Sequence, residues 1–234
     1  RRLAIVDLSP TGHQPMVSPC GRWLLVFNGE IYNHADLRAE LLASNSATMP
    51  FFRGSSDSEV LLAWLIRHGV AGLPRLRGMF AFCLYDQQER TALLARDPHG
   101  IKPLYVWQGS SGELAFASEL RALLASGLPS RQLNTAALAA FLATGSVPEP
   151  ATLVAGIERL PAGSWAHWQN GQLKIQSWMP LPESVVPQAI GVWDAATAAA
   201  TTRAALQASV AAHLIADVPV GLFLSGGLDS GALL

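Results

Sequence analysis

Short apolar segments separated by turn residues dominate the first part of the chain. Clusters rich in Gly, Ser, Pro, Asn and Asp lie between these segments. This spacing is typical of strands that are joined as hairpins in antiparallel sheet. We therefore expect strands over residues 3–6, 16–17, 23–27, 79–85, 91–95, 104–107 and 114–117, and a further hairpin of 164–169 and 173–178 around Asn170-Gly171.

Helical patterns interrupt these strands. Each begins behind a Ser, Asp or Asn residue, the types that most often cap the amino end of a helix. Sheets with flanking helices predict an α+β layered domain. We expect helices over 35–43 (cap Asn33), 59–68 (cap Ser56 or Asp57) and 135–143 (cap Asn134).

The carboxyl-terminal part has a different pattern. A proline-rich stretch, 180–187, is the best candidate for a linker. After it, an alanine-rich helix is expected over 195–216, and it leads into the apolar run 218–224, which has the length of a strand. We therefore predict an α+β domain over 1–182, a linker over 183–194, and the first helix and strand of an α/β domain over 195–234.

Composition and charge exclude several classes of function. Charged residues make up 14% of the chain and the formal net charge is −1, so neither a nucleic-acid partner nor an anionic membrane is expected. Uncharged stretches such as 132–148 are rich in Ala, Thr, Ser and Gly, which argues against a membrane-spanning helix. Cys20 and Cys83 lie far apart and have no metal-ligand spacing, which favours a reducing, cytoplasmic location.

The clearest chemical signal is a loop of small residues directly after the apolar run. The loop is Ser225-Gly226-Gly227-Leu228-Asp229-Ser230, and the residues behind it can open a helix. A strand, a small-residue loop and a helix start together form a backbone cradle for phosphate. A kinase-type loop needs a lysine that this loop lacks. We therefore predict a pyrophosphate site in which N–H and O–H groups hold the anion and Asp229 takes Mg2+.

Residues of the first domain form a candidate grip for an amino acid. The Asn28 amide and the Gly29 N–H can converge on one oxygen, as the donors of an oxyanion hole do. Arg2 can hold a carboxylate with two hydrogen bonds, and Asp57 can hold an ammonium group. Each has a plainer alternative, because Asn-Gly is a common turn, Arg2 is a surface cation and Asp57 is a helix cap.

Five motifs that occur in order decide between these alternatives. They are Arg2 to Asp7, Asn28 to His34, Ser56 to Val60, Arg96 to Tyr105 and Ser225 to Ser230. With them the chain resembles the glutamine-hydrolysing asparagine synthetases along essentially its whole length.

This resemblance implies a four-layer αββα glutaminase domain of the N-terminal-nucleophile type, followed by a Rossmann-like ATP-pyrophosphatase domain. It also implies a ligase that uses ATP and Mg2+ to activate aspartate. Ammonia from glutamine then gives asparagine, with AMP and pyrophosphate released.

The resemblance also implies a role for individual residues. Arg2 would bind the glutamine α-carboxylate, Asp57 its α-amino group, and Asn28 with Gly29 the oxyanion. Ile5 and Glu30 would line the same pocket. Leu224 would lie near adenosine, and the pyrophosphate would be held by Ser225, Gly226, Gly227, Asp229 and Ser230, with the metal at Asp229. Arg96, Asp97 and Lys102 match a motif with a structural role, which is to order the loop beside the glutamine site.

One departure concerns the nucleophile. In the resembled family it is a cysteine at residue 1 whose own amino group is the base. This chain begins with Arg1, and neither Cys20 in a turn nor Cys83 in an apolar strand can replace that cysteine. We therefore expect the polypeptide as given to have no glutaminase activity. We expect no ATP turnover either, because a parallel sheet needs further strands beside residues 218–224.

Three other interpretations stay open. Another two-domain glutamine amidotransferase would share the first domain, but the Ser225 loop argues against it. A ligase of the β-lactam-synthetase kind would act on a different carboxylate. A non-catalytic glutamine-binding module is the third alternative. The resemblance also leaves a homodimer open as the assembly.

Overall fold

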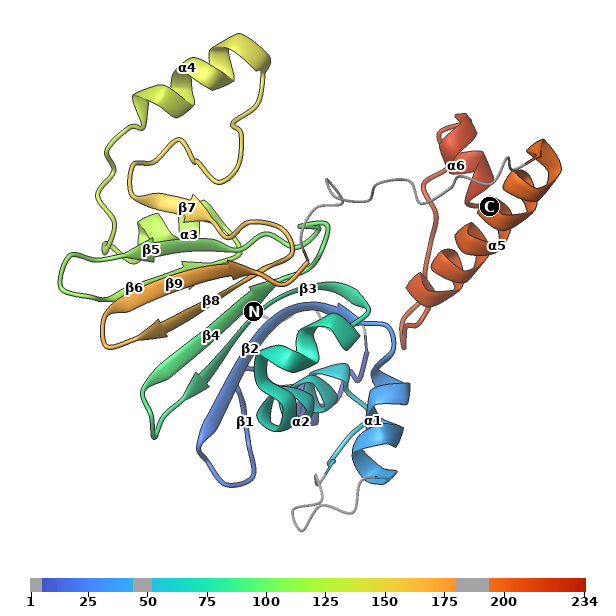
Figure 1. Ribbon diagram of the computed structural model, residues 1–234, viewed down its shortest axis with the longest axis horizontal. Coiled ribbons are helices and arrows are strands. Elements are labelled where there is room, and N and C mark those ends of the chain that lie inside the picture. Colours follow the sequence, from blue (N-terminus) through green and yellow to red (C-terminus); the bar gives the residue numbers. More distant parts are fainter. Residues whose placement is uncertain (1–5, 44–51, 180–193) are drawn as a thin grey trace.

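Two antiparallel sheets form the body of the computed structural model, which describes residues 6–43, 52–179 and 194–234. The larger sheet has six strands in the order β1-β2-β3-β4-β8-β9, and the smaller has three in the order β6-β5-β7. Figure 1 shows α1 and α2 on one side of the larger sheet and the smaller sheet on the other. The strands are β1 (Met16–Val17), β2 (Trp23–Ile31), β3 (Gly78–Asp86), β4 (Thr91–Arg96), β5 (Tyr105–Gln108), β6 (Leu114–Ala117), β7 (Ile157–Arg159), β8 (Ser164–Gln169) and β9 (Gln172–Ser177).

The helices flank these sheets or follow them in the chain. No helix in the three described ranges is long and apolar enough to cross a membrane. The helices are α1 (His34–Ala43), α2 (Asp57–His68), α3 (Leu120–Ala125), α4 (Thr135–Thr144), α5 (Ala195–His213) and α6 (Leu228–Ala232), with 3-10 turns η1 (Pro10–Gly12) and η2 (Gly69–Arg75).

The sequence of β3 explains why this strand lies inside the larger sheet. Phe80 and Phe82 pack toward α1 and α2 in one core, whereas Ala81 and Cys83 pack toward the smaller sheet in a second core. A strand buried on both faces needs apolar residues at nearly every position rather than at alternate ones. The continuous apolar run in the sequence therefore specifies a central strand.

Four layers follow from the two cores. The first core fills the space between the α1–α2 layer and the larger sheet, and the second fills the space between the two sheets. On the outer side, α3 contacts β6 and forms a thin fourth layer, while α4 stands away from both sheets in Figure 1. The predicted α+β sandwich with layers α, β, β and α is confirmed.

The predicted strands between residues 16 and 178 are confirmed, with ends that differ by a few residues. The main difference is β2, which continues to Ile31 instead of ending at residue 27. The predicted strand 3–6 lies outside the described residues except for Val6, which is not in a strand. The turn at Asn170-Gly171 joins β8 and β9 as expected.

Two of the three predicted helix caps are confirmed by side-chain hydrogen bonds, and the third, Asn33, precedes α1 as predicted but directs its side chain elsewhere. Ser56 and Asn134 accept hydrogen bonds from backbone N–H groups in the first turns of α2 and α4. Asn33 instead donates to the Arg75 carbonyl at 2.9 Å and accepts from the Arg77 N–H at 3.0 Å. These bonds join the end of β2 to the start of β3. The Asn33 carbonyl accepts from the Leu37 N–H of α1 at 3.1 Å, whereas the Asn33 side chain satisfies backbone groups of a neighbouring segment.

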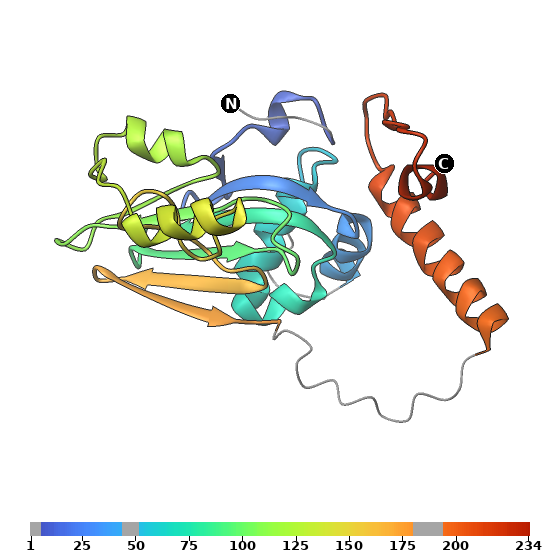
Figure 2. The ribbon, with the colours of Figure 1, turned by 90° about the horizontal axis from the view of Figure 1, so that it is seen from above.

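The carboxyl-terminal part departs most from expectation. Helix α5 is present and is capped by Asp194, but it ends at His213 rather than at residue 216. The strand predicted over 218–224 is not formed, and Phe223 there is 98% exposed. A strand needs a neighbour for its backbone groups, and the described residues offer none. Figure 2 shows α5 beside the sandwich without joining either sheet. The predicted linker 183–194 lies outside the described residues except for Asp194.

Candidate functional site

The candidate oxyanion residues lie inside β2 rather than after a strand. Gly29 is opposite Phe80 of β3 and has a φ of 155°. A Cβ built on Gly29 would lie 2.1 Å from the Met79 carbonyl oxygen. Only glycine fits where the backbone of a neighbouring strand comes this close. Gly29 is therefore required by the sheet itself, independently of any catalytic role.

Asn28 precedes this glycine, and its side chain contacts the residue that follows a strand of the smaller sheet. Its Nδ2 donates to the Ser118 hydroxyl at 3.0 Å, and Ser118 follows directly after β6. The Asn28 side chain is exposed. The amide is thus both oriented by a protein partner and open to a ligand, as an oxyanion donor must be.

Asp57 is brought to the same strand by one hydrogen bond. It is the first residue of α2 and is only 4% exposed, and its Oδ2 accepts from the Ile31 N–H at 3.0 Å. Burial raises the pKa of Asp57 above its usual value, and the Ile31 N–H acts in the opposite direction. The Asp57 carboxylate is therefore bonded to β2 two residues after Gly29, although Asp57 is far from that glycine in the sequence.

Glu30 lies between Gly29 and Ile31 in β2 and is also buried. Its Oε1 has no hydrogen-bond partner among the described residues. Burial raises the pKa of Glu30, and the charge of Asp57 raises it further. Two buried carboxyl groups that repel one another favour a positively charged group beside them. An α-ammonium group is such a partner.

Tyr32 extends the site toward the carboxyl-terminal part, which the sequence did not indicate. Its hydroxyl is buried without a partner in the described part of the chain. Burial, and then the charges of Glu30 and Asp97, raise the pKa of Tyr32 to about 12. The Tyr32 ring packs on His213 at the end of α5, with ring centroids 4.5 Å apart. The continuation of β2 therefore touches α5.

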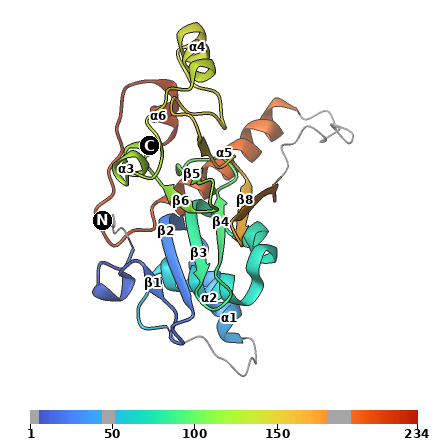
Figure 3. The same cartoon turned by 90° about the vertical axis from the view of Figure 1, so that its left-hand side faces the viewer.

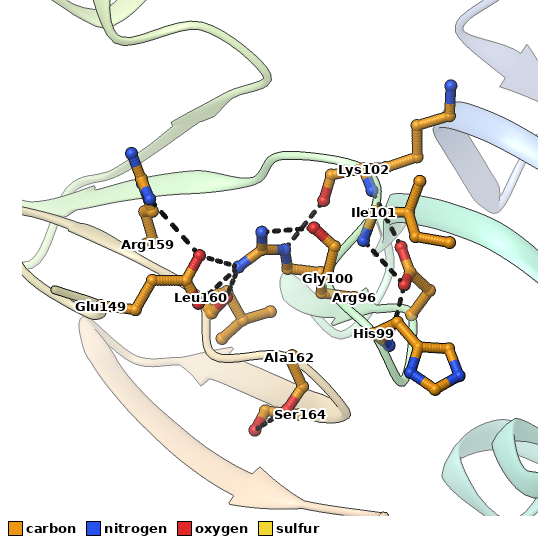
Figure 4. Close-up of polar contacts among 11 residues, drawn as sticks. Arg96, His99, Gly100, Ile101, Lys102, Glu149, Arg159, Leu160, Ala162 and Ser164 are labelled. Carbon is orange, nitrogen blue, oxygen red and sulfur yellow. Dashed lines mark hydrogen bonds and ion pairs between the residues drawn. The ribbon is translucent and has the colours of Figure 1, made fainter. Parts of the chain in front are cut away.

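A hub of buried charges fixes the loop that follows β4 (Figure 4). The Asp97 carboxylate accepts from four backbone N–H groups, those of Phe80, His99, Ile101 and Lys102, at 2.9–3.2 Å. Because Phe80 is also the partner of Gly29 across the sheet, Asp97 holds the strand segment opposite the candidate oxyanion residue.

Arg96 holds the other side of the same loop. It donates to the carbonyls of Gly100 at 2.7 Å, Lys102 at 2.8 Å and Leu160 at 2.8 Å, and it also pairs with Glu149. Lys102 takes part through its backbone, and Figure 4 shows its side chain directed away from the guanidinium. Arg96 and Asp97 therefore order this loop, as predicted, and its place beside a glutamine site stays a prediction.

The Ser225–Ser230 loop is exposed and leads into α6. The hydroxyls of Ser225 and Ser230 lie 3.0 Å apart, and Gly226 has a φ of 78°, which favours glycine. Gly227 precedes α6 and gives it no side-chain cap. In the part of the chain that the structure describes, no three His, Cys, Asp or Glu residues gather as a metal site.

Comparison with known families identifies both parts of the chain. Residues 1–179 match the family described as glutamine amidotransferase domain. The chain belongs to this family. Residues 201–234 match a second family, asparagine synthase.

Several relatives of this chain are named as glutamine-hydrolysing asparagine synthetases. A putative glutamine-hydrolysing asparagine synthetase of Mycobacterium tuberculosis H37Rv is 40% identical over 99% of this chain. Asparagine synthetase B of Escherichia coli K12 is 36% identical over 99%, and asparagine synthetase 1 of Bacillus subtilis 168 is 35% identical over 98%. The chain spans 35–36% of the length of these relatives.

The structure brings together four of the predicted pocket residues of the amidotransferase. Asn28, Gly29 and Glu30 share β2, and Asp57 is bonded to the end of that strand. A cavity of about 840 Å³ borders β1 and α2, but none of these four lines it. The binding roles of the four stay predictions. The other two predicted pocket residues, Arg2 and Ile5, lie outside the described residues.

Proposed function

We propose that this chain carries the glutamine site and the ATP-binding loop of a glutamine-hydrolysing asparagine synthetase. The observation that supports this most is the order of the two family matches, amidotransferase first and asparagine synthase second. Relatives with that name match at least 98% of the chain. We assign residues 1–182 to the first domain and 195–234 to the second, joined by 183–194. A cytoplasmic location fits this assignment.

In this proposal the first domain of the full-length enzyme binds glutamine and releases ammonia from it, with an attacking cysteine that residues 1–234 do not contain. Asp57 receives the α-ammonium group and Glu30 lines the same pocket, because both are buried carboxyl groups for which a cation would offset the cost of burial. Asn28 and Gly29 donate to the oxyanion that forms when the side-chain amide is attacked. Arg2 receives the α-carboxylate, and Ile5 lines the pocket.

The second domain would bind ATP with Mg2+ and activate the aspartate carboxylate. ATP supplies the adenylyl group that turns a poor acyl donor into a good one. The hydroxyls of Ser225 and Ser230, 3.0 Å apart, and the open backbone at Gly226 and Gly227 suit a pyrophosphate. Asp229 suits the metal, and Leu224 the adenosine. Ammonia released in the first domain then displaces AMP to give asparagine.

The test measures glutamine-dependent asparagine synthesis by the full-length enzyme. Purified enzyme receives ATP, Mg2+, aspartate and glutamine labelled with 15N in the side-chain amide. We expect 15N-asparagine, glutamate, AMP and pyrophosphate in equal amounts. An Asp229→Ala variant should still release glutamate but form no pyrophosphate. Glutamate release by the wild-type enzyme without asparagine would refute the proposed acceptor.

A further inference from the structure

Asp7 adopts a backbone conformation that is rare for a residue with a side chain. Its φ is 53°, in the left-handed region, and the residue is buried. Such conformations cost free energy and persist only where neighbouring contacts hold them in place. The contacts of Asp7 therefore indicate what the conformation serves.

The carboxylate of Asp7 gathers donors from two segments. From its own turn, it accepts from the Ser9 N–H at 3.0 Å, from the Ser9 hydroxyl, and from the Thr11 hydroxyl at 3.0 Å. From the loop before α2, it accepts from the Ser55 N–H at 3.1 Å. The Ser9 hydrogen bond is the main reason that the pKa of Asp7 lies below its usual value. Asp7 thus binds the loop as a carboxylate.

That loop leads directly into Asp57, the first residue of α2, and side chains hold it by hydrogen bonds from two sides. A Cβ built on Gly54 would lie 2.3 Å from Asp7 Oδ2, so the loop fits against Asp7 only because residue 54 is glycine. On the other side, Glu59 accepts from the N–H groups of Arg53 at 2.9 Å and Gly54 at 2.8 Å. Ser55 is two residues before Asp57, so a movement of Asp7 reaches Asp57 through one peptide segment.

The backbone of Asp7 is held by the carboxyl-terminal part of the chain. Its N–H donates to Asp217 Oδ2 at 2.8 Å. Asp217 lies between α5 and the Ser225 loop, and Figure 3 shows this segment running past the amino-terminal segment. The ring contact between His213 and Tyr32 is a second junction of the same two parts. The carboxyl-terminal part therefore touches the site at both Tyr32, which follows β2, and Asp7.

We propose that Asp7 is a positioning residue through which Asp217 sets the place of the Asp57 loop. The chain of contacts runs from the Asp217 carboxylate to the Asp7 N–H, and from the Asp7 carboxylate to the Ser55 N–H. The domain that activates the acceptor thereby controls the affinity of the other domain for glutamine. This inference rests on the proposed function, namely that Asp57 binds the glutamine ammonium group and that the second domain activates the acceptor.

The experiment compares Asp217→Ala and Asp217→Asn with the wild-type full-length enzyme. Glu158→Ala, which removes an exposed carboxylate on β7, is the matched control. Glutamate release gives KM and kcat for glutamine. Hydrogen–deuterium exchange of the segment 52–58 reports on the loop directly. Synthesis from free ammonia reports on the second domain alone.

We expect Asp217→Ala to raise the glutamine KM about three- to tenfold, the range for one lost hydrogen bond of ordinary strength, because Asp217 acts on the site only through Asp7 and Ser55. Exchange in 52–58 should become faster, with kcat and ammonia-dependent synthesis unchanged. Asp217→Asn keeps an acceptor oxygen and should stay within about twofold of wild type.

Equal KM and exchange for Asp217→Ala and Glu158→Ala would overturn the inference. A loss of ammonia-dependent synthesis with unchanged glutamine KM would do the same, because it would confine Asp217 to the second domain. If the wild-type enzyme releases glutamate but makes no asparagine, the proposed acceptor is wrong. The KM comparison still tests the inference in that case.

Discussion

Replacement of Arg96 by lysine tests the hub that joins the two sheets. Arg96 is 4% exposed and its guanidinium donates to the carbonyls of Gly100, Lys102 and Leu160. Lysine keeps the charge, but one ammonium group cannot face three carbonyls that surround a planar fork. At least two buried carbonyls should therefore lose their donor. At about 1–1.5 kcal/mol each, the free energy of unfolding should fall by about 2–3 kcal/mol. The partner Glu149 is partly exposed, so loss of that ion pair adds little.

Urea unfolding followed by tryptophan fluorescence measures this change. Arg121→Lys is the control, because the Arg121 side chain is 86% exposed and pairs with an exposed glutamate. The control should lie within about 0.5 kcal/mol of wild type. In a thermal scan, Arg96→Lys should lower the midpoint by about 5–10 °C. If Arg96→Lys is as stable as Arg121→Lys, the three carbonyls do not depend on the guanidinium and the reasoning is refuted.

Three further changes test the site and the core. Asp57→Asn should raise the glutamine KM of the full-length enzyme about 10- to 100-fold, as expected for a lost charged hydrogen bond. Because burial raises the pKa of Asp57, wild-type affinity should fall as the pH drops through that raised value, and a flat profile down to pH 4 would contradict this. Gly29→Ala should lower the free energy of unfolding by about 1–3 kcal/mol, since its Cβ would lie 2.1 Å from the Met79 carbonyl; an unchanged urea midpoint would exclude the clash. Burial raises the pKa of Cys83 to about 12, so a thiol reagent at pH 8 should label exposed Cys20 in the native protein and Cys83 only in denaturant; rapid native labelling of both would show that Cys83 is accessible.

Local pattern was enough to predict most elements of the sandwich. Strand and helix positions follow from residues that are near one another in the sequence. The turn at Asn170-Gly171 and the caps at Ser56 and Asn134 are of this kind. The ordered motifs also determined the family before any contact was known, because five separate motifs are far more specific than one. The same motifs named Asn28, Gly29 and Asp57 as candidates.

Contacts between distant segments needed the tertiary structure. Asn33 fits the pattern of a helix cap, yet it bonds to the start of β3, because unsatisfied backbone groups there lie within its reach. The apolar run 218–224 has the composition of a strand, but strand formation depends on a neighbour that local sequence does not specify.

The site itself was decided in the same way. The hydrogen bond from the Ile31 N–H to Asp57 and the bond from the Asp7 N–H to Asp217 each join segments far apart in the chain. The sequence named the candidate residues for the chemistry, through their side-chain types and motifs. Only the folded arrangement decided which of them meet, because that depends on how the sheets and helices pack.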